Sequence, residues 1–306
     1  MDKPSRLRAF WRRQRPPQHH RSRHYGMVPW LFLLPSLLGV GLLVLLPFVD
    51  AVRRSFFNAM GTSFVGLKNY QSVLKNEAFQ LAAKNTLRFM LTCLPMLLII
   101  SLLLAVMIAA YKDQSGLFKT SFLVPMAIPV ASIAFLWKVI FYDNGLLNAL
   151  LAQLGMEPMP FLHSGAAFGV LVGTYLWKNT GYDMVLWLAG LSDISPGLYE
   201  ASEIDGAGTL ARFFRITLPA LRSTFFTVIV LSLLNSFKVF REAYLVTGQY
   251  PDESIYLLQH LFNNWFTTLD IDKLCAGAVL LAVSMLLLIL LLQRLLLRKE
   301  DGGATE

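Results

Sequence analysis

Charged residues are scarce in this 306-residue sequence. Asp, Glu, Lys and Arg make up 15% of the chain, whereas hydrophobic residues make up 55%. Soluble domains carry roughly 25% charged residues. The low charge therefore excludes an ordinary soluble domain and favours a chain that is exposed to lipid.

Cysteine is also scarce, since Cys93 and Cys275 are the two in the chain and both lie in or beside apolar segments. They form no CxxC pair, which excludes a disulfide framework and a cysteine-based zinc site. His19 and His20 are adjacent, but no further ligand lies near them in the sequence. We therefore expect no bound metal.

Catalytic and nucleotide-binding motifs are missing. The sequence contains no GxxxxGK[ST] phosphate loop, no HExxH and no GxSxG. His163 and His260 stand in loops without a nearby Ser or Cys partner. An enzyme inside the bilayer would need a nucleophile and a base there, and no such pair is evident. We predict that the chain is not an enzyme and binds no cofactor itself.

The net charge of +8 is unevenly distributed, because eight of the 27 Lys and Arg residues precede residue 24. This bias predicts a basic tail over residues 1–26 rather than a nucleic-acid-binding surface. The apolar stretch that follows, 26–49, is longer than the core of a signal peptide, which has about 7–15 residues. No small-x-small cleavage site follows it. We interpret it as an uncleaved first membrane span.

Long apolar runs recur along the rest of the chain. A hydrocarbon core of about 30 Å needs roughly 20 apolar residues in a helix. The runs are continuous and lack the alternation of barrel strands. The sequence predicts an all-α, polytopic membrane protein with six transmembrane helices, at about 27–50, 85–111, 118–142, 166–191, 221–246 and 273–297.

Basic residues are absent from two of the predicted loops, 143–165 and 247–272, whereas cations flank the loops on the other side. The positive-inside rule therefore places both termini and the loop at 192–222 in the cytoplasm. The first outer loop departs from the rule, with five cations between residues 53 and 84. We predict a tail at 1–26, a membrane domain at 27–298 and a second tail at 299–306.

Five charged residues lie within the predicted spans: Lys178, Asp183, Lys238, Arg241 and Glu242. Charges in lipid are costly, so these side chains should face a cavity, a partner helix or an interface. The first two are five residues apart, which is not ideal for pairing on one helical face. The last three lie near the outer end of the fifth span. Snorkelling to the interface and a functional role remain open for them.

The third and fifth spans carry further signals. Pro125 and Pro129 predict a kinked third span, either structural or used when helices rock during transport. In the fifth span, Asn235, Phe237 and Phe240 are candidates for a substrate path, because amides and aromatic faces bind sugars. Packing, or a place in the interfacial aromatic belt, is the alternative role for the two aromatic residues.

The cytoplasmic loop contains an expected helix and turn. Ser195 followed by Pro196 is typical of a helix start, with the Ser hydroxyl as cap. Gly206 should end this helix, since glycine adopts the left-handed conformation. A second amphipathic piece should run to Pro219. We expect an acidic knob that fits a groove in another protein, with an apolar ridge formed by Leu198, Ala201 and Ile204 or Ala207.

Part of this loop resembles the EAA loop of permeases from binding-protein-dependent ABC importers. That motif reads E-A-A-x3-G-x9-I-x-L-P, and the sequence from Glu200 to Pro219 departs from it only at Ser202. Other segments are similar to the carbohydrate, maltose-type branch: Val65–Tyr70, Asn85-Thr86, Phe237–Phe240 and Leu245–Gly248. After Gly248 the branch commonly continues Gly-Gly-Pro, whereas this chain reads Gln249-Tyr250-Pro251.

The resemblance implies a permease subunit that imports a sugar or oligosaccharide across the bacterial plasma membrane. It implies a second permease, two ATPase subunits that use ATP and Mg²⁺, and an extracellular solute-binding protein. Glu200 would contact the ATPase, Ala201 and Ser202 would pack against it, and Gly206 would form the bend. The implied coupling set is Leu198, Tyr199, Glu200, Ala201, Ser202, Glu203, Asp205, Gly206 and Ala207.

Two alternatives remain open. The solute could be another polyol or a glycerophosphate. An ion-coupled secondary carrier is the other alternative, and it should show buried carboxylates and inverted repeats. Asp183 is the one carboxylate within the spans that stands out as a candidate, and no repeat is evident.

Overall fold

The computed structural model describes residues 28–110 and 115–297, and helices dominate them. The predicted tails at 1–26 and 299–306 lie outside the described residues. The chain divides into two compact units, Met1–Asp50 and Ala51–Glu306. The described part of the first unit contains α2 (Val28–Val40), the π-helix η2 (Gly41–Leu45) and the start of α3 (Leu46–Ser55). Its large apolar side chains are exposed, as expected of a lipid-facing helix; Phe32, for example, is 81% exposed.

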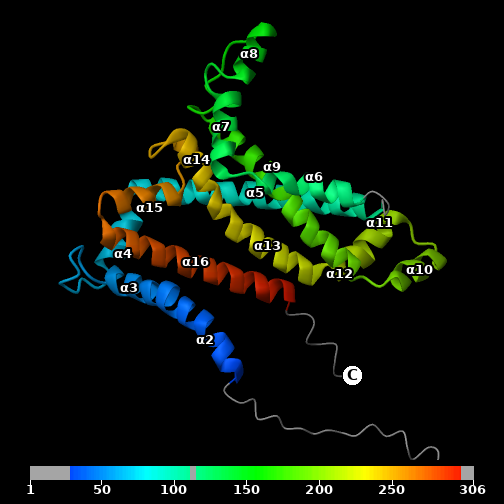
Figure 1. Ribbon diagram of the computed structural model, residues 1–306, viewed down its shortest axis with the longest axis horizontal. Coiled ribbons are helices and arrows are strands. Elements are labelled where there is room, and N and C mark those ends of the chain that lie inside the picture. The colour runs from blue at the N-terminus through cyan, green and yellow to red at the C-terminus, as the bar shows by residue number, and fades with distance from the viewer. Residues whose placement is uncertain (1–27, 111–114, 298–306) are drawn as a thin grey trace, which may run out of the picture. The chain divides into compact units, whose positions relative to one another are not determined.

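The second unit is a helix bundle (Figure 1). Its helices are α4 (Lys68–Lys75), α5 (Glu77–Ala110), α6 (Ser115–Ala127), α7 (Val130–Phe141), α8 (Leu146–Gln153), α9 (Ala166–Ser192), α10 (Pro196–Ile204), α11 (Thr209–Arg212), η3 (Phe213–Thr217), α12 (Leu218–Ala220), α13 (Arg222–Ser236), η4 (Phe237–Val239), α14 (Phe240–Thr247), η5 (Glu253–Ile255), α15 (Leu258–Thr267) and α16 (Ile271–Leu297).

Helix α9 lies at the centre of the bundle and packs against α5, α6 and α13, while α16 packs against α13. The approach of α9 to α6 is close at Gly181, where an added Cβ would lie 1.9 Å from the Phe122 carbonyl oxygen. Helix α10 lies at one end of the bundle, and α4 and α15 lie at the opposite end (Figure 1). The chain thus places its two longest polar loops at opposite ends.

Five stretches of the described residues are long and apolar enough to cross a membrane: Trp30–Ser55, Glu77–Ala110, Val130–Gln153, Arg222–Thr247 and Ile271–Leu297. Helix α9 matches the predicted fourth span in its bounds, and its 27 residues would extend about 40 Å. It is less apolar than the five because it carries Lys178, Asp183 and several small or polar residues. Those residues are tolerated because α9 is the helix that other helices surround.

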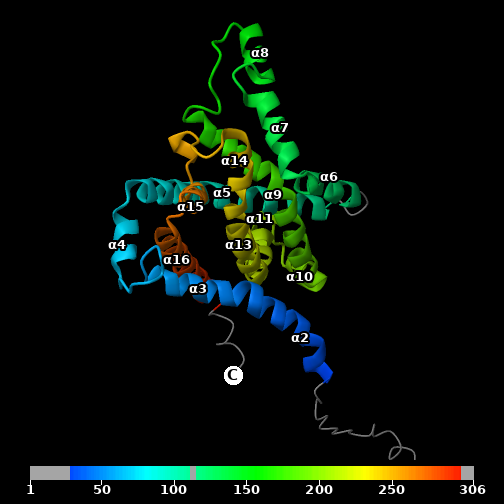
Figure 2. The same ribbon diagram turned by 60° about the vertical axis from the view of Figure 1, so that its left-hand side comes forward.

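The third predicted span, 118–142, is not one kinked helix. Helix α6 ends at Ala127, Pro129 is extended (ψ 141°), and α7 begins at Val130. Proline disfavours the helical conformation of the residue before it, which accounts for the break. Helix α6 would extend only about 20 Å, too short to cross the bilayer. Helices α7 and α8 turn away from the bundle in both views (Figures 1 and 2).

Candidate functional site

Helix α10 and its terminal turn form as the sequence predicts. Pro196 is the first helical residue, and Gly206 has a φ of +72°. The Gly206 amide donates to the Glu203 carbonyl at 3.0 Å, and the Ala207 amide donates to the Ser202 carbonyl at 2.9 Å. These bonds satisfy carbonyls that a helix end leaves free. The predicted cap is wrong in one respect, because the Ser195 side chain makes no capping hydrogen bond.

The predicted coupling residues divide between two faces. Tyr199 and Ser202 turn into the loop, where the Tyr199 hydroxyl lies 2.9 Å from Thr217 Oγ1 and the Ser202 hydroxyl donates to the Tyr199 carbonyl at 2.7 Å. Ser202 is buried, so its side chain packs within this loop rather than on the exposed surface. Ala207 is half-buried. The exposed members are Leu198, Glu200, Ala201, Glu203, Asp205 and Gly206.

The expected apolar ridge is present and uncovered in this chain. Leu198 is 52% exposed and Ile204 is 88% exposed. Glu203 pairs with Arg212 of α11, whereas no hydrogen bond or ion pair within the described residues is seen for Glu200. The chain therefore presents an apolar strip and one uncommitted carboxylate on the same short helix.

The second amphipathic piece is more continuous than predicted. Pro219 was expected to break it, but helix α12 passes through Pro219 and the irregular backbone lies elsewhere. A π-helical turn, η3, precedes it, and Leu221 (ψ 4°) separates α12 from α13. A π-turn shifts the hydrogen-bond register of a helix, which is one way to accommodate a residue without an amide hydrogen.

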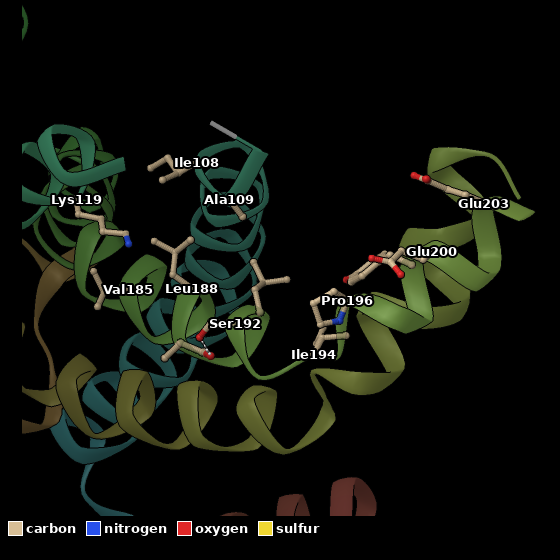
Figure 3. Close-up of a pocket in the computed structure, with 13 residues that line it drawn as sticks. Ile108, Ala109, Lys119, Val185, Leu188, Ser192, Ile194, Pro196, Glu200 and Glu203 are labelled. Carbon is tan, nitrogen blue, oxygen red and sulfur yellow. Dashed lines mark hydrogen bonds between the residues drawn. The ribbon is translucent and has the colours of Figure 1, made fainter. Parts of the chain in front are cut away.

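A pocket of about 890 Å³ lies where α10 meets the ends of α5, α6 and α9 (Figure 3). Its walls are largely apolar, with Ile108 from α5 and Val185 and Leu188 from α9. Lys119 extends into it from α6, and Glu200 and Glu203 extend from α10. The pocket thus connects the exposed helix to the ends of three bundle helices.

A second, polar cavity of about 250 Å³ lies among the α6–α7 junction, α9 and the α13–α14 junction. The short 3-10 helix η4 interrupts the fifth span here. Interrupted helices are a common way to place polar groups inside membrane proteins. The polar and charged side chains that line the cavity are Thr174, Tyr175, Lys178, Asn179, Asn235, Lys238, Arg241 and Glu242.

Two of the charges in this cavity form an ion pair. Lys178 of α9 pairs with Glu242 of α14. Glu242 is only 3% exposed, so snorkelling does not apply to it. Sequence reasoning missed the pair because the residues are 64 positions apart. The signal available was that a cation within a span needs an acid, and the spans offer few acids.

Asp183, considered above as a partner for Lys178, bonds elsewhere. It is buried, and one carboxylate oxygen accepts a hydrogen bond from the Ser232 hydroxyl of α13 at 2.6 Å. Tyr175, two turns earlier on α9, donates to the Ser232 carbonyl at 2.9 Å. Trp187 donates to the Ser101 hydroxyl of α5 at 3.0 Å. The polar residues of α9 therefore fasten the bundle together.

The three substrate-path candidates do not lie together. Asn235 lines the polar cavity and accepts a hydrogen bond from Lys238 Nζ at 2.7 Å. Phe237 is half-buried in η4 and is not part of the cavity wall. Phe240 packs edge-on against His260, with ring centroids 4.7 Å apart. Phe240 therefore has a packing position, as the alternative for this aromatic residue predicts.

The other segments that carried the resemblance hold loops in place. Asn69 donates to the carbonyls of Ser55 and Phe57 at 3.0 and 2.7 Å. Asn85 donates to the carbonyls of Glu253 and Tyr256 at 2.5 and 3.1 Å, and the Thr86 hydroxyl accepts from the Leu258 amide at 3.0 Å. These side chains supply hydrogen bonds to loop backbone groups, among them the buried Tyr256 carbonyl.

The bundle, its apolar spans and its polar interior define a polytopic α-helical membrane transport protein. The model of the family described as "binding-protein-dependent transport system inner membrane component" matches residues 89–299. The chain belongs to this family. It is a permease subunit of a binding-protein-dependent ABC importer, as the EAA-like loop predicts.

Curated relatives match most of the chain. The sulfoquinovosyl glycerol transport permease of Agrobacterium fabrum is 31% identical and aligns over 83% of this chain and 86% of its own length. The trehalose/maltose transport permease MalF of Thermococcus litoralis is 30% identical over 84% and 89%. The sn-glycerol-3-phosphate transport permease UgpA of Yersinia pestis is 30% identical over 85% and 90%.

A solved structure shares the fold. A chain of a bacterial ABC transporter involved in the import of the acidic polysaccharide alginate matches with a TM-score of 0.78. The match covers 89% of this chain and 96% of the other, at 23% identity. The same type of transporter has also been solved in complex with an alginate pentasaccharide-bound periplasmic protein. The likeness confirms the all-α membrane fold.

Proposed function

We propose that this permease imports a sugar, an oligosaccharide or a related polyol such as a glycerophosphate or glycoside. A second permease would complete the channel, and an extracellular solute-binding protein would deliver the solute. The names of the relatives support this range, since they include transporters of maltose, sulfoquinovosyl glycerol and glycerol phosphate. The asymmetry of basic residues supports a plasma-membrane protein with both termini and α10 on the cytoplasmic side.

The exposed surface of α10 is the observation that carries the coupling role. Ile204 is 88% exposed and Leu198 is 52% exposed, on a helix that also presents the uncommitted Glu200. Apolar side chains that lie in water cost about 25 cal/mol per Å² of apolar area relative to their burial. An amphipathic helix with such a face is suited to a groove of a partner. The partner that fits is a pair of cytoplasmic ATPases.

Chemical energy would enter through those ATPases. This chain has no phosphate loop of its own, so ATP and Mg²⁺ would be held by the partner subunits. The residues that line the pocket beside α10 would then transmit the movement of the ATPase to the ends of α5, α6 and α9. Because these helices also form the bundle core, a tilt of α10 would change the positions of the residues that line the polar cavity.

The experiment reverses one charge on the proposed contact. We expect Glu200→Lys in the complete transporter to reduce sugar uptake to background and to weaken copurification of the ATPase. The fold should survive, because Glu200 makes no bond within the described residues. Uptake by intact cells and copurification from solubilised membranes are the two measurements.

The matched control is Glu157→Lys, which reverses an exposed carboxylate in the loop before α9. It should leave uptake and ATPase binding unchanged. Normal uptake and normal copurification of Glu200→Lys would contradict the coupling role. Failure of the wild-type chain to bind any ATPase would contradict the proposed function as a whole.

A further inference from the structure

The polar cavity contains more positive than negative charge. Three cations, Lys178, Lys238 and Arg241, line it together with one carboxylate, Glu242. Lys178 and Glu242 pair with each other. This leaves two positive charges in a membrane-spanning segment, where an unpaired charge is costly.

Neither remaining cation has an acidic partner among the described residues. Lys238 Nζ donates to the neutral amide oxygen of Asn235 at 2.7 Å. Arg241 donates through Nε to the Lys238 carbonyl at 3.5 Å, so its terminal guanidinium nitrogens are not engaged by that bond. Both side chains are exposed in the free chain. The Arg241 guanidinium offers several N–H donors to an incoming anion, and the Lys238 ammonium offers a compact positive charge.

The same cavity also offers groups that bind hydroxyls. Glu242 is 3% exposed, and its Oε2 has no hydrogen-bond partner within the described residues. Asn179 donates to the Tyr175 carbonyl at 2.8 Å through its amide nitrogen, which leaves its amide oxygen as an acceptor. A buried carboxylate oxygen without a partner is unfavourable until a donor reaches it. A sugar or polyol hydroxyl is such a donor.

We propose that the solute carried past this cavity is an anionic polyol or glycoside, bearing a sulfonate, phosphate or carboxylate, rather than a neutral sugar. This inference rests on the proposed function. Lys238 and Arg241 would bind the anionic group, while Glu242 and the side-chain amides of Asn179 and Asn235 would bind hydroxyls. The cavity of about 250 Å³ is below the roughly 300–1,000 Å³ of pockets for drug-sized ligands. It therefore holds a single charged ring or the charged end of a longer molecule.

The test compares uptake of solutes that differ mainly in charge. The panel pairs sulfoquinovosyl glycerol with glucosyl glycerol, and trigalacturonate with maltotriose. It also includes sn-glycerol 3-phosphate. Uptake is measured in cells that carry the complete transporter, with the ATPases first shown to copurify. We expect uptake of at least one anionic member in preference to its neutral counterpart.

Substitution then assigns the preference to the cavity. The double variant Lys238→Gln/Arg241→Gln should lower uptake of the anionic member about tenfold or more, the loss expected for a charge-assisted hydrogen bond. Uptake of any neutral member should change by less than about twofold. The conservative pair Lys238→Arg/Arg241→Lys should recover much of the activity. Lys75→Gln, which removes an exposed cation in α4, is the matched control and should change neither class.

Three outcomes would overturn the assignment. One is an assembled transporter that takes up only neutral members, or none of the panel. Another is a double variant that loses anionic and neutral uptake equally, as expected if the two cations bind lipid headgroups or support the fold. The third is a double variant that keeps its preference for anions. A chain that assembles with no ATPase would instead overturn the proposed function.

Discussion

At one end of the bundle the loop that contains η5 and α15 is held by side chains of α5, whereas at the other end α10 extends with little internal support. Ile255, Leu257 and His260 in the first loop are at most 2% exposed. In the second loop, by contrast, Ile204 is 88% exposed and Leu210 is 75% exposed. Both loops join membrane-spanning segments, so membrane topology alone does not account for the difference.

The contrast supports the proposal that a partner protein covers the α10 end. The α15 end satisfies its own backbone: Asn85 bonds two loop carbonyls and Thr86 accepts from the Leu258 amide. The α10 end has internal bonds at Tyr199, Ser202 and Glu203 and leaves its apolar strip uncovered. An end whose apolar side chains are buried within the chain is stable without a partner. An end with an exposed apolar strip gains stability when a partner covers the strip.

The largest expected effect is at the turn after α10. Gly206 has a φ of +72°, and proline fixes φ near −65° and removes the amide that bonds the Glu203 carbonyl. We expect Gly206→Pro to abolish uptake while membrane insertion and the α15 end remain intact. Uptake assays and the yield of folded protein in membranes are the measurements.

The control for this variant is Gly206→Asn, since asparagine tolerates the left-handed conformation. It should retain a substantial part of the uptake. If Gly206→Pro transported normally, the bend at this position would have no role in coupling. If it failed to insert, the α10 end would be needed for folding, and the comparison of the two ends would be wrong.

Sequence reasoning located most of the fold because apolar runs report burial in lipid directly. The predicted fourth and sixth spans, 166–191 and 273–297, correspond to Ala166–Ser192 and Ile271–Leu297. The third prediction failed at Pro129, since a proline signals that a helix is perturbed but not in which direction the chain continues. Whether the helix bends or breaks depends on packing around it.

The candidate site divides in the same way. Local signals sufficed for α10, where Pro196 and Gly206 mark its two ends. The partners of Lys178 and Asp183 could not be predicted, because they depend on how α9 packs against α13 and α14. The aromatic residue Phe240 was ambiguous for a related reason: an aromatic side chain suits a sugar site and a packed interior equally.

Removing the Asn85 side chain should weaken the end of the bundle that contains η5 and α15. Asn85→Ala would remove the side-chain donor to the carbonyls of Glu253 and Tyr256. The Glu253 carbonyl would keep its hydrogen bond from the Tyr256 amide, whereas the Tyr256 carbonyl would lose its donor. Leaving one buried polar group unsatisfied costs about 1–3 kcal/mol, so we expect a loss of about that size in the free energy of unfolding. Hydrogen exchange should increase across 253–267 and remain unchanged across α10.

Asn144→Ala is the matched control, because Asn144 is an exposed amide. It should shift neither the thermal midpoint nor the exchange pattern. An Asn85→Ala protein with wild-type exchange at 253–267 would show that the α5 side chains do not hold this loop. A uniform increase at both ends would show that the ends are not independent.

The smallest effect concerns pH at the supported end. His260 is fully buried, and its Nδ1 accepts a hydrogen bond from the Leu257 amide at 3.2 Å. Burial lowers the pKa of His260 from 6.5 to about 4. The unfolded chain therefore binds a proton at a higher pH than the folded protein, so stability is fully present above about pH 6.5 and falls as the pH drops toward 4.

This loss amounts to about 1.4 kcal/mol per pH unit, or about 2 kcal/mol at pH 5. Protonation would also place a hydrogen on the nitrogen that accepts from Leu257, which would release the start of α15. We expect hydrogen exchange in 258–267 to accelerate between pH 6.5 and 5, and His260→Gln to abolish that pH dependence. His163→Gln, at an exposed histidine, should leave it intact. If α10 showed the same acceleration, the effect would be global rather than a property of the buried imidazole.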